Sequence, residues 1–318
     1  MKVYLASPHS ALLYKNRLAA FLNILVGGTE GMKVFLAGGI SGNLKPLWTI
    51  LTKNAKPPFT DKDIEKAMKI FLAGAYSRAW LFDDRVCGEA VAGYKPYILE
   101  SFFYMDDVME KCLPLFGDFL LDSGAFTFMM NTKSNINWDE YIEKYAEFIN
   151  RRDIKKFFEL DIDSVVGYEQ VLKYREKLES LTGKKCIPVW HKSRGIKDFK
   201  ETCDKYDYIA IGGIVSGEIN SKQYGAFPSM IAEAHRRGAK IHGLGFTSLD
   251  WLPKCHFDSV DSTAWTTGNR FGHIYKFNGK KMTKIDCPEN KRLSDPRAVA
   301  LNNYTEWIKF QKYAEANL

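Results

Sequence analysis

Two aspartates at the ends of short apolar runs are the residues of this chain best suited to do chemistry. Asp122 follows Leu120 and Leu121, and Asp258 lies far downstream in the run Phe257–Val260. A pair of carboxylates can divide the work at an anomeric carbon, because one attacks C1′ of a sugar while the other transfers the proton of the leaving group. We therefore predict that Asp122 and Asp258 are catalytic. Taken singly, each could instead cap the helix that follows a strand.

Two further aspartates are alternates to this pair. Asp261 lies three residues after Asp258, and alternation along a strand puts the two side chains on opposite faces unless a turn intervenes. The residues alone leave open which of the two is the nucleophile. Asp163 is a candidate second acid, although its simpler role is that of a helix cap.

Other residues near predicted strand ends suit a flat purine. Guanine presents two donors, N1–H and the exocyclic N2–H₂, beside the acceptor O6. A carboxylate such as Asp161 matches the donor edge, and a backbone N–H of Gly212 or Gly213 matches O6. Ser123 can add a hydrogen bond, and Phe126 can stack on the ring. Together they predict a guanine pocket.

These residues depend on an alternation of strands and helices to bring them together. Eight short apolar runs are predicted to be strands: 70–73, 97–100, 119–121, 157–162, 186–190, 208–211, 240–244 and 257–260. Amphipathic helices between them indicate a parallel sheet buried on both faces. The expected α/β fold is a (β/α)₈ TIM barrel with its site at the carboxyl ends of the strands, and an open doubly wound sheet is the alternative.

The amino-terminal part of the chain carries near copies of one motif. They are Met1–Ser7, Met32–Gly38 and Met68–Gly74, and each is predicted to be a strand followed by a turn. We expect two domains: residues 1–67, with the extra strand-turn repeats, and residues 68–318, with the barrel. The first is either an accessory sheet or the start of the barrel.

Composition permits a large core and sets few limits on partners. The chain has 318 residues, 46% of them hydrophobic, and a formal net charge of +7. A modest basic excess permits contact with nucleic acid without requiring it. No two of the six cysteines lie close together, so we expect reduced thiols, no metal and no cofactor. Because no signal peptide or apolar run of ~20 residues is present, we expect a cytoplasmic protein with no membrane partner.

Five motifs, in order over residues 118–265, resemble the tRNA-guanine transglycosylase superfamily. The motifs are Asp122–Phe126, Leu160–Ile162, Ala210–Glu218, Ile241–Gly245 and Phe257–Ser259. The family is a (β/α)₈ barrel that exchanges guanine for a 7-deazaguanine. The resemblance implies that Asp258 is the nucleophile and Asp122 the general acid/base.

The resemblance also implies a base pocket at the strand ends. Its residues are Ser123, Phe126, Asp161, Trp190, His191, Gly212, Gly213, His242 and Gly243. Phe126 would stack on one face of the base, and His242 would lie on the other, where the family often has a methionine. Trp190 or His191 takes the place of a glutamine that reads the base.

The chain departs from the tRNA enzymes after the nucleophile strand. Their Cys-x-Cys-x-x-Cys…His zinc site is absent, since only Cys287 follows, and Asp261–Trp265 replaces an arginine-containing stretch. In this the chain resembles the compact, zinc-free DNA transglycosylases of phages and bacteria, which place 7-deazaguanines such as preQ0 in DNA. A phage-encoded member would act in the host cytoplasm.

The expected function is therefore DNA-guanine transglycosylation. The expected partners are DNA, guanine and a preQ0-type 7-deazaguanine base, joined through a covalent aspartyl-glycosyl intermediate. The alternatives are the same exchange on tRNA, a non-catalytic nucleic-acid-binding paralogue, and an ordinary glycosidase that releases sugar without exchanging the base.

Overall fold

A computed structural model describes residues 3–5, 34–36, 68–83, 91, 93–124, 127, 136–288, 293 and 295–318. The chain divides into two compact units, Met1–Ile64 and Glu65–Leu318. In the first unit, β1 (Val3–Leu5) and β2 (Val34–Leu36) pair in parallel. These strands fall in the first two copies of the repeated motif, and the turns predicted after them lie outside the described residues.

The second unit is built on a curled, seven-stranded parallel sheet. Its strands, in chain order, are β3 (Lys69–Ala73), β4 (Tyr97–Ser101), β5 (Asp118–Asp122), β6 (Val189–Trp190), β7 (Tyr208–Ile211), β8 (Lys240–Gly243) and β9 (Ser259–Ser262). Their order in the sheet is β5-β4-β3-β9-β8-β7-β6. The first strand therefore pairs with the last, with Lys69 opposite Ser259.

A short segment joins the two edges of this sheet. Phe157 bridges in parallel to Leu121 of β5, and Phe158 bridges in parallel to Ile187, two residues before β6. Backbone hydrogen bonds of 2.8–3.1 Å support both bridges. With this eighth parallel segment the fold is TIM-barrel-like. The strand predicted over 157–162 is shorter in the structure because the backbone leaves the ladder after Glu159.

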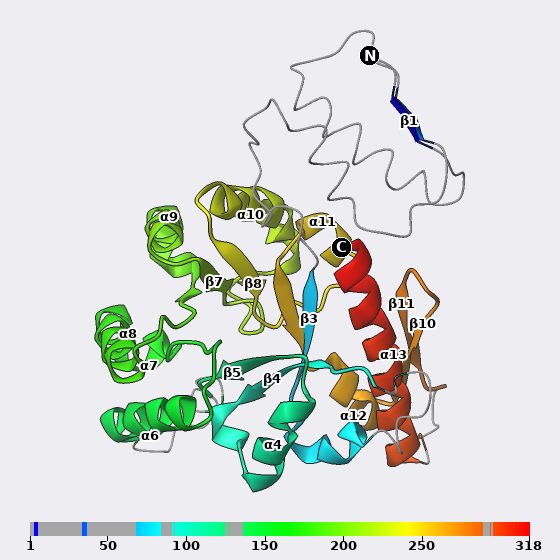
Figure 1. The fold of residues 1–318 in the computed structure, drawn as a ribbon, viewed down its shortest axis with the longest axis horizontal. Helices are drawn as coiled ribbons and strands as arrows, with labels where there is room; N and C mark the ends of the chain where they lie inside the picture. The colour runs from blue at the N-terminus through cyan, green and yellow to red at the C-terminus, as the bar shows by residue number, and fades with distance from the viewer. Residues whose placement is uncertain are drawn as a thin grey trace. The chain divides into compact units, whose positions relative to one another are not determined.

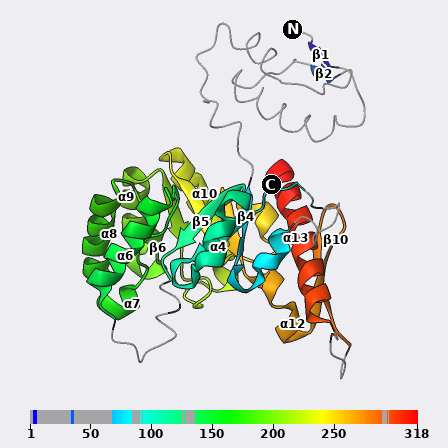
Figure 2. The ribbon, with the colours of Figure 1, turned by 60° about the horizontal axis from the view of Figure 1, so that its bottom comes forward.

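Helices cover the outside of the strands. They are α4 (Asp107–Cys112), α6 (Trp138–Arg151), α7 (Asp163–Val166), α8 (Tyr168–Thr182), α9 (Gly195–Lys205), α10 (Phe227–Arg236), α11 (Leu252–Cys255), α12 (Gly268–Phe271) and α13 (Pro296–Asn317). Figure 1 and Figure 2 show α6, α8 and α9 on one side of the strands and α13 on the other. None of the described helices is both long and apolar enough to cross a membrane.

Helix ends follow the local signals of the sequence. The Asn137 side chain accepts a hydrogen bond from the backbone N–H of Glu140 (3.4 Å) and so caps α6. Gly183 ends α8 in the left-handed region, with φ of 64°, where a glycine carries no steric cost.

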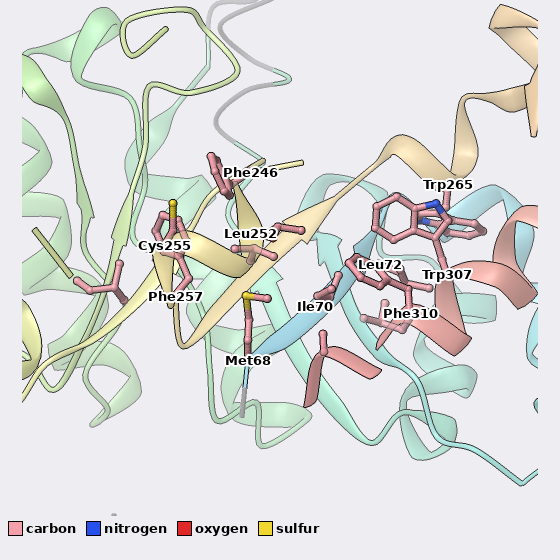
Figure 3. Packing of buried hydrophobic residues seen from close by; sticks show 14 of the residues in the cluster. Met68, Ile70, Leu72, Phe246, Leu252, Cys255, Phe257, Trp265, Trp307 and Phe310 are labelled. Atoms are coloured by element: carbon pink, nitrogen blue, oxygen red, sulfur yellow. The ribbon is translucent and has the colours of Figure 1, made fainter. Parts of the chain in front are cut away.

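The long helix α13 packs beside β3 together with the hairpin of β10 (His273–Phe277) and β11 (Met282–Asp286). Trp307 and Phe310 of α13 pack near Leu72 and Trp265, as Figure 3 shows. Full burial of one such apolar side chain contributes roughly 1.5–3 kcal/mol. The buried Gln311 accepts a hydrogen bond from the backbone N–H of Tyr97 (3.1 Å), so the helix also satisfies strand polar groups.

Alternation along the strands separates an inner layer from an outer layer. Phe71 and Phe158 belong to an inner cluster, and their rings lie 6.2 and 5.3 Å from the imidazole of His242 on β8. Ile70 and Val260 instead join the outer cluster, which contains residues of α10 and α13. Residues of opposite parity on one strand thus have different neighbours, and this decides which polar side chains reach the inside.

Candidate active site

Carboxylates from four segments gather at the carboxyl end of the barrel. They are Glu100 at the end of β4, Asp122 at the end of β5, Asp161 after the bridging segment and Asp261 in β9. The charges of Asp161 and Asp261 both act on Asp122, and the charge of Asp122 acts on Glu100. This is the end of the barrel at which a TIM-barrel-like fold places functional side chains.

Asp122 is the centre of this group. Burial of its carboxyl group, followed by the charges of Asp161 and Asp261, raises its pKa to about 6. The backbone N–H of Gly124 donates to its Oδ2 atom (2.9 Å), which opposes the rise. Gly124 has a φ of 85°, and a Cβ there would lie only 3.1 Å from Phe103 and Tyr141. A carboxyl group whose pKa is near 6 can both donate and accept a proton near neutral pH.

Glu100 is a buried carboxylate at the end of β4 that the sequence analysis did not select. It is 1% exposed, and burial raises its pKa to about 7. Its oxygens accept hydrogen bonds from the backbone N–H groups of Tyr76 (2.8 Å) and Ser101 (3.0 Å). The signal that pointed to Asp122, an acid closing an apolar strand, was also present here.

Asp261, predicted only as an alternate, is the carboxylate of β9 that reaches the site. It is 5% exposed, and its Oδ1 atom accepts a hydrogen bond from the backbone N–H of Gly245 (2.6 Å). The Nε2 atom of His242 lies 3.1 Å from the same oxygen. Ser259 shares the inward parity of Asp261, and its Oγ lies 2.6 Å from His242 Nδ1.

Asp258, predicted as the nucleophile, lies elsewhere. It precedes β9, which begins at Ser259, and so stands at the amino end of the barrel. Its Oδ2 atom accepts a hydrogen bond from the backbone N–H of Ile241 (2.7 Å) and lies 2.7 Å from Nε2 of His235 on α10. The carboxylate thus faces the outer helices rather than Asp122. The strand starts two residues later than the predicted run 257–260, which leaves Asp258 in front of it.

His242 is also placed differently from the prediction that it covers a face of the base. Its side chain is fully buried inside the barrel, beside the rings of Phe71 and Phe158. Both ring nitrogens are engaged by Ser259 and Asp261. His242 therefore supports Asp261 and has no exposed face for a base.

His191 lies between two carboxylates. Its Nε2 is 2.7 Å from Asp161 Oδ1, and its Nδ1 is 2.9 Å from Glu218 Oε2. Burial by itself lowers the pKa of His191, but the hydrogen bonds and charges of the two acids outweigh it and raise the pKa to about 9. His191 is therefore a cation at neutral pH. Glu218 is a second site residue that the sequence analysis did not select, although it closes one of the quoted motifs.

The two glycines after β7 make room for this pair. A Cβ on Gly212 would come within 2.7 Å of Val189 and 3.0 Å of the His191 ring. A Cβ on Gly213, whose φ is 78°, would come within 2.6 Å of a Glu218 carboxylate oxygen. The structure thus brings both predicted glycines next to His191 and Glu218. Close packing is their evident local role.

Trp190 and Asp163 face away from the site. Trp190 is buried on the outside of β6, where its Nε1 donates to the Gly195 carbonyl (3.0 Å) and its ring packs on Phe199. Asp163 accepts a hydrogen bond from Nε of Arg194 (2.8 Å). Of the predicted alternatives Trp190 and His191, only His191 points toward Asp161, and Asp163 belongs to an ion pair.

Three predicted base contacts remain. Ser123 is 1% exposed, and its Oγ has no hydrogen-bond partner among the described residues. A buried hydroxyl left without a partner costs about 1–3 kcal/mol, so a ligand group at this point would be stabilised. A Cβ on Gly243 would lie 3.1 Å from Phe246 and Phe257, which makes it a packing position. Phe126 lies outside the described residues.

In the described part of the chain, no group of three or more His, Cys, Asp or Glu residues is arranged to hold a metal ion. The arrangement instead combines a carboxyl group poised for proton transfer, a carboxylate held by donors, and a charged imidazole. Such a set is suited to covalent and acid–base catalysis.

No protein-family model and no curated protein matches this chain. Among solved structures it is similar to a protein from Coccidioides immitis assigned as a fructose-1,6-biphosphate aldolase, with a TM-score of 0.49 and 10% identity over 80% of this chain and 91% of that one. It is also similar to the carboxyl transferase domain of Rhizobium etli pyruvate carboxylase with pyruvate, with a TM-score of 0.41 and 11% identity over 91% of this chain and 53% of that one. A third similar structure is nitroalkane oxidase from Streptomyces ansochromogenes, with a TM-score of 0.31 and 11% identity over 80% of this chain and 89% of that one. Similarities at this level carry no inference about activity.

Proposed function

We propose that this protein is a transglycosylase that exchanges guanine in a nucleic acid for a 7-deazaguanine, with Asp261 as nucleophile and Asp122 as general acid/base. The observation that carries the proposal is the difference between these two neighbouring carboxylates. Asp261 is held by a backbone N–H and by His242, whereas the pKa of Asp122 is raised to about 6. Titratable groups whose environments differ in this way mark a division into nucleophile and acid/base.

The reaction is a double displacement. A carboxylate oxygen of Asp261 attacks C1′ of the target nucleotide, the bond from C1′ to N9 of guanine breaks, and its electron pair stays on the departing base. Protonated Asp122 gives its proton to that base. The 7-deazaguanine then loses its N9 proton to Asp122, its N9 attacks C1′, and Asp261 is released. The sugar keeps its configuration, and Asp122 ends protonated as it began.

The base pocket of this proposal rests on Asp161, His191 and Ser123. One oxygen of Asp161 contacts the charged His191, so the other is available for the N1–H and N2–H₂ donors of guanine. The unpartnered hydroxyl of Ser123 offers a further hydrogen bond beside Asp122. Because C1′ of a stacked nucleotide is hard to reach, the target is flipped out of its helix.

DNA is the polymer we propose. The support comes from the sequence, in which the zinc ligands of the tRNA enzymes are absent after the nucleophile strand. In the structure the chain after β9 instead forms the hairpin β10–β11 and the helix α13. Exchange on tRNA is the competing outcome of the experiment.

The test is incubation of the protein with a labelled preQ0 base and either duplex DNA or unmodified tRNA. We expect label in the DNA and a protein–DNA adduct on a denaturing gel that Asp261→Asn abolishes and Asp258→Asn retains. Label only in tRNA overturns the choice of DNA. Release of guanine without incorporation of label identifies a glycosidase, and absence of both exchange and base release rejects the catalytic proposal.

A further inference from the structure

Four polar side chains, the last of them the proposed nucleophile Asp261, form a hydrogen-bonded chain inside the barrel. Tyr208 of β7 contacts Ser259 of β9 through their hydroxyl groups, and Ser259 Oγ lies 2.6 Å from Nδ1 of His242 on β8. The opposite nitrogen, Nε2, lies 3.1 Å from Oδ1 of Asp261. The chain crosses three neighbouring strands and ends at the site.

Enclosure of this chain restricts its partners. His242 is fully buried, Ser259 is 2% exposed, and the rings of Phe71 and Phe158 pack beside the imidazole. Buried polar atoms must find hydrogen bonds within the protein, so each member depends on the next. Burying polar groups inside an otherwise apolar barrel costs free energy, so packing alone gives no reason for them to be there.

The chemistry of the four groups gives the chain one direction. An ionised Asp261 can only accept, so Nε2 of His242 must carry the proton. If Nε2 holds the only ring proton, Nδ1 is an acceptor and Ser259 donates to it. The Ser259 oxygen in turn accepts from Tyr208, whose burial raises the pKa of its hydroxyl and keeps it protonated.

We infer that His242 is a positioning residue, held by Tyr208 and Ser259 in its Nε2–H form so that it orients Asp261 for attack. The inference rests on the proposed role of Asp261. His242 and the backbone N–H of Gly245 both engage Oδ1, which stabilises the ionised carboxylate and turns Oδ2 toward the reacting carbon. His242 was expected to cover a face of the base; in this inference it instead holds the Asp261 carboxylate by a hydrogen bond.

The first test is ¹⁵N NMR of the full-length protein with labelled histidine, in which His242 is assigned by its loss in His242→Gln. We expect the ring proton on Nε2, and a change in the Nδ1 signal when Ser259→Ala removes its donor. A proton on Nδ1, or a ring that ignores Ser259→Ala, overturns the inference. This readout does not depend on turnover, so it still decides if no base exchange is found.

The second test compares two replacements of His242. A glutamine amide can place an N–H near the position of Nε2, whereas the thioether of His242→Met cannot donate. We expect the rate of adduct formation to fall about 10–100-fold in His242→Met with an unchanged KM for DNA, and His242→Gln to recover most of it. Equal rates in both variants overturn the inference. If His242→Met does not fold, Ser259→Ala takes its place, and a wild-type rate in that variant has the same meaning.

Discussion

The two aspartates at either end of β9 have nearly the same local partners and very different surroundings. Asp258 contacts His235 and the backbone N–H of Ile241, and Asp261 contacts His242 and the backbone N–H of Gly245. In both pairs one carboxylate oxygen serves both contacts. A histidine and a backbone amide around an aspartate therefore do not identify a catalytic group.

What separates the two residues is where the sheet places them. Asp258 precedes the strand and faces α10, so its contact with His235 joins a helix to the sheet. Asp261 lies inside the barrel near its carboxyl end, where its charge acts on Asp122. The lesson is that the neighbours beyond the hydrogen-bond partners decide function. In the proposed function, the second carboxylate makes Asp261 part of a reaction centre.

The largest expected effect is the loss of covalent chemistry in Asp261→Asn. An amide cannot attack C1′, so we expect the rate of adduct formation to fall by on the order of 10³-fold or more. Time courses on denaturing gels measure it, with Asp258→Asn as the matched control on the same strand. The comparison breaks if the control loses activity and Asp261→Asn does not.

Asp122→Asn is expected to lose activity and to gain stability. Removal of the acid/base should slow base exchange by about 10²–10⁴-fold. Because the folded-state pKa of Asp122 is raised to about 6, above its unfolded value of about 3.9, ionisation opposes folding above pH 6 and this cost disappears as the pH falls toward 4. Urea unfolding should therefore show a variant more stable than wild type at pH 7.5, by about 1–3 kcal/mol, and little different at pH 4. A variant that is less stable at pH 7.5 would contradict the burial of this charge.

Glu218→Gln should lower the pKa of His191 from about 9. Since the raised pKa stabilises the folded state, the contribution is complete below pH 6.5 and is lost as the pH rises through 9. We expect the variant to be less stable than wild type by at most about 1 kcal/mol at pH 6, because the pair is partly exposed, with the difference shrinking toward pH 9. An NMR titration that gives the same pKa for His191 in both proteins would show that Glu218 does not raise it.

The smallest effect is expected in Asp258→Asn. Its contact with His235 is partly exposed, and an asparagine oxygen can still accept from the N–H of Ile241. We expect a loss of stability of about 1 kcal/mol or less and a rate of adduct formation within about twofold of wild type. Urea unfolding and the same gel assay check both values. A large loss of activity would restore Asp258 as a candidate nucleophile.

Much of the fold and part of the site followed from local patterns. Short apolar runs alternating with amphipathic helices predicted parallel strands, and β7 was predicted at its observed bounds, Tyr208–Ile211. Asp122 at the carboxyl end of β5 and His191 after β6 were both among the predicted site residues. Their positions after strands followed from the sequence because a strand end is marked by its own residues.

Other site residues escaped prediction because their role depends on distant partners. The charge of Asp122, on the neighbouring strand, acts on Glu100, and Glu218 contacts His191, 27 residues away. Trp190 was chosen together with His191, yet the two point to opposite faces of the sheet. No local pattern separates such neighbours.

The sequence by itself determined that acids would stand at strand ends around a parallel sheet, because periodicity and turn residues are local properties. The tertiary structure alone decided which acids meet. Pairing of β9 with β3 and β8 starts the strand at Ser259, and since side chains alternate with a period of two, that start sends Asp261 inward and leaves Asp258 outside. The choice between the two could not be made from either residue alone, because it depends on the pairing of β9 with β8 and with the distant strand β3.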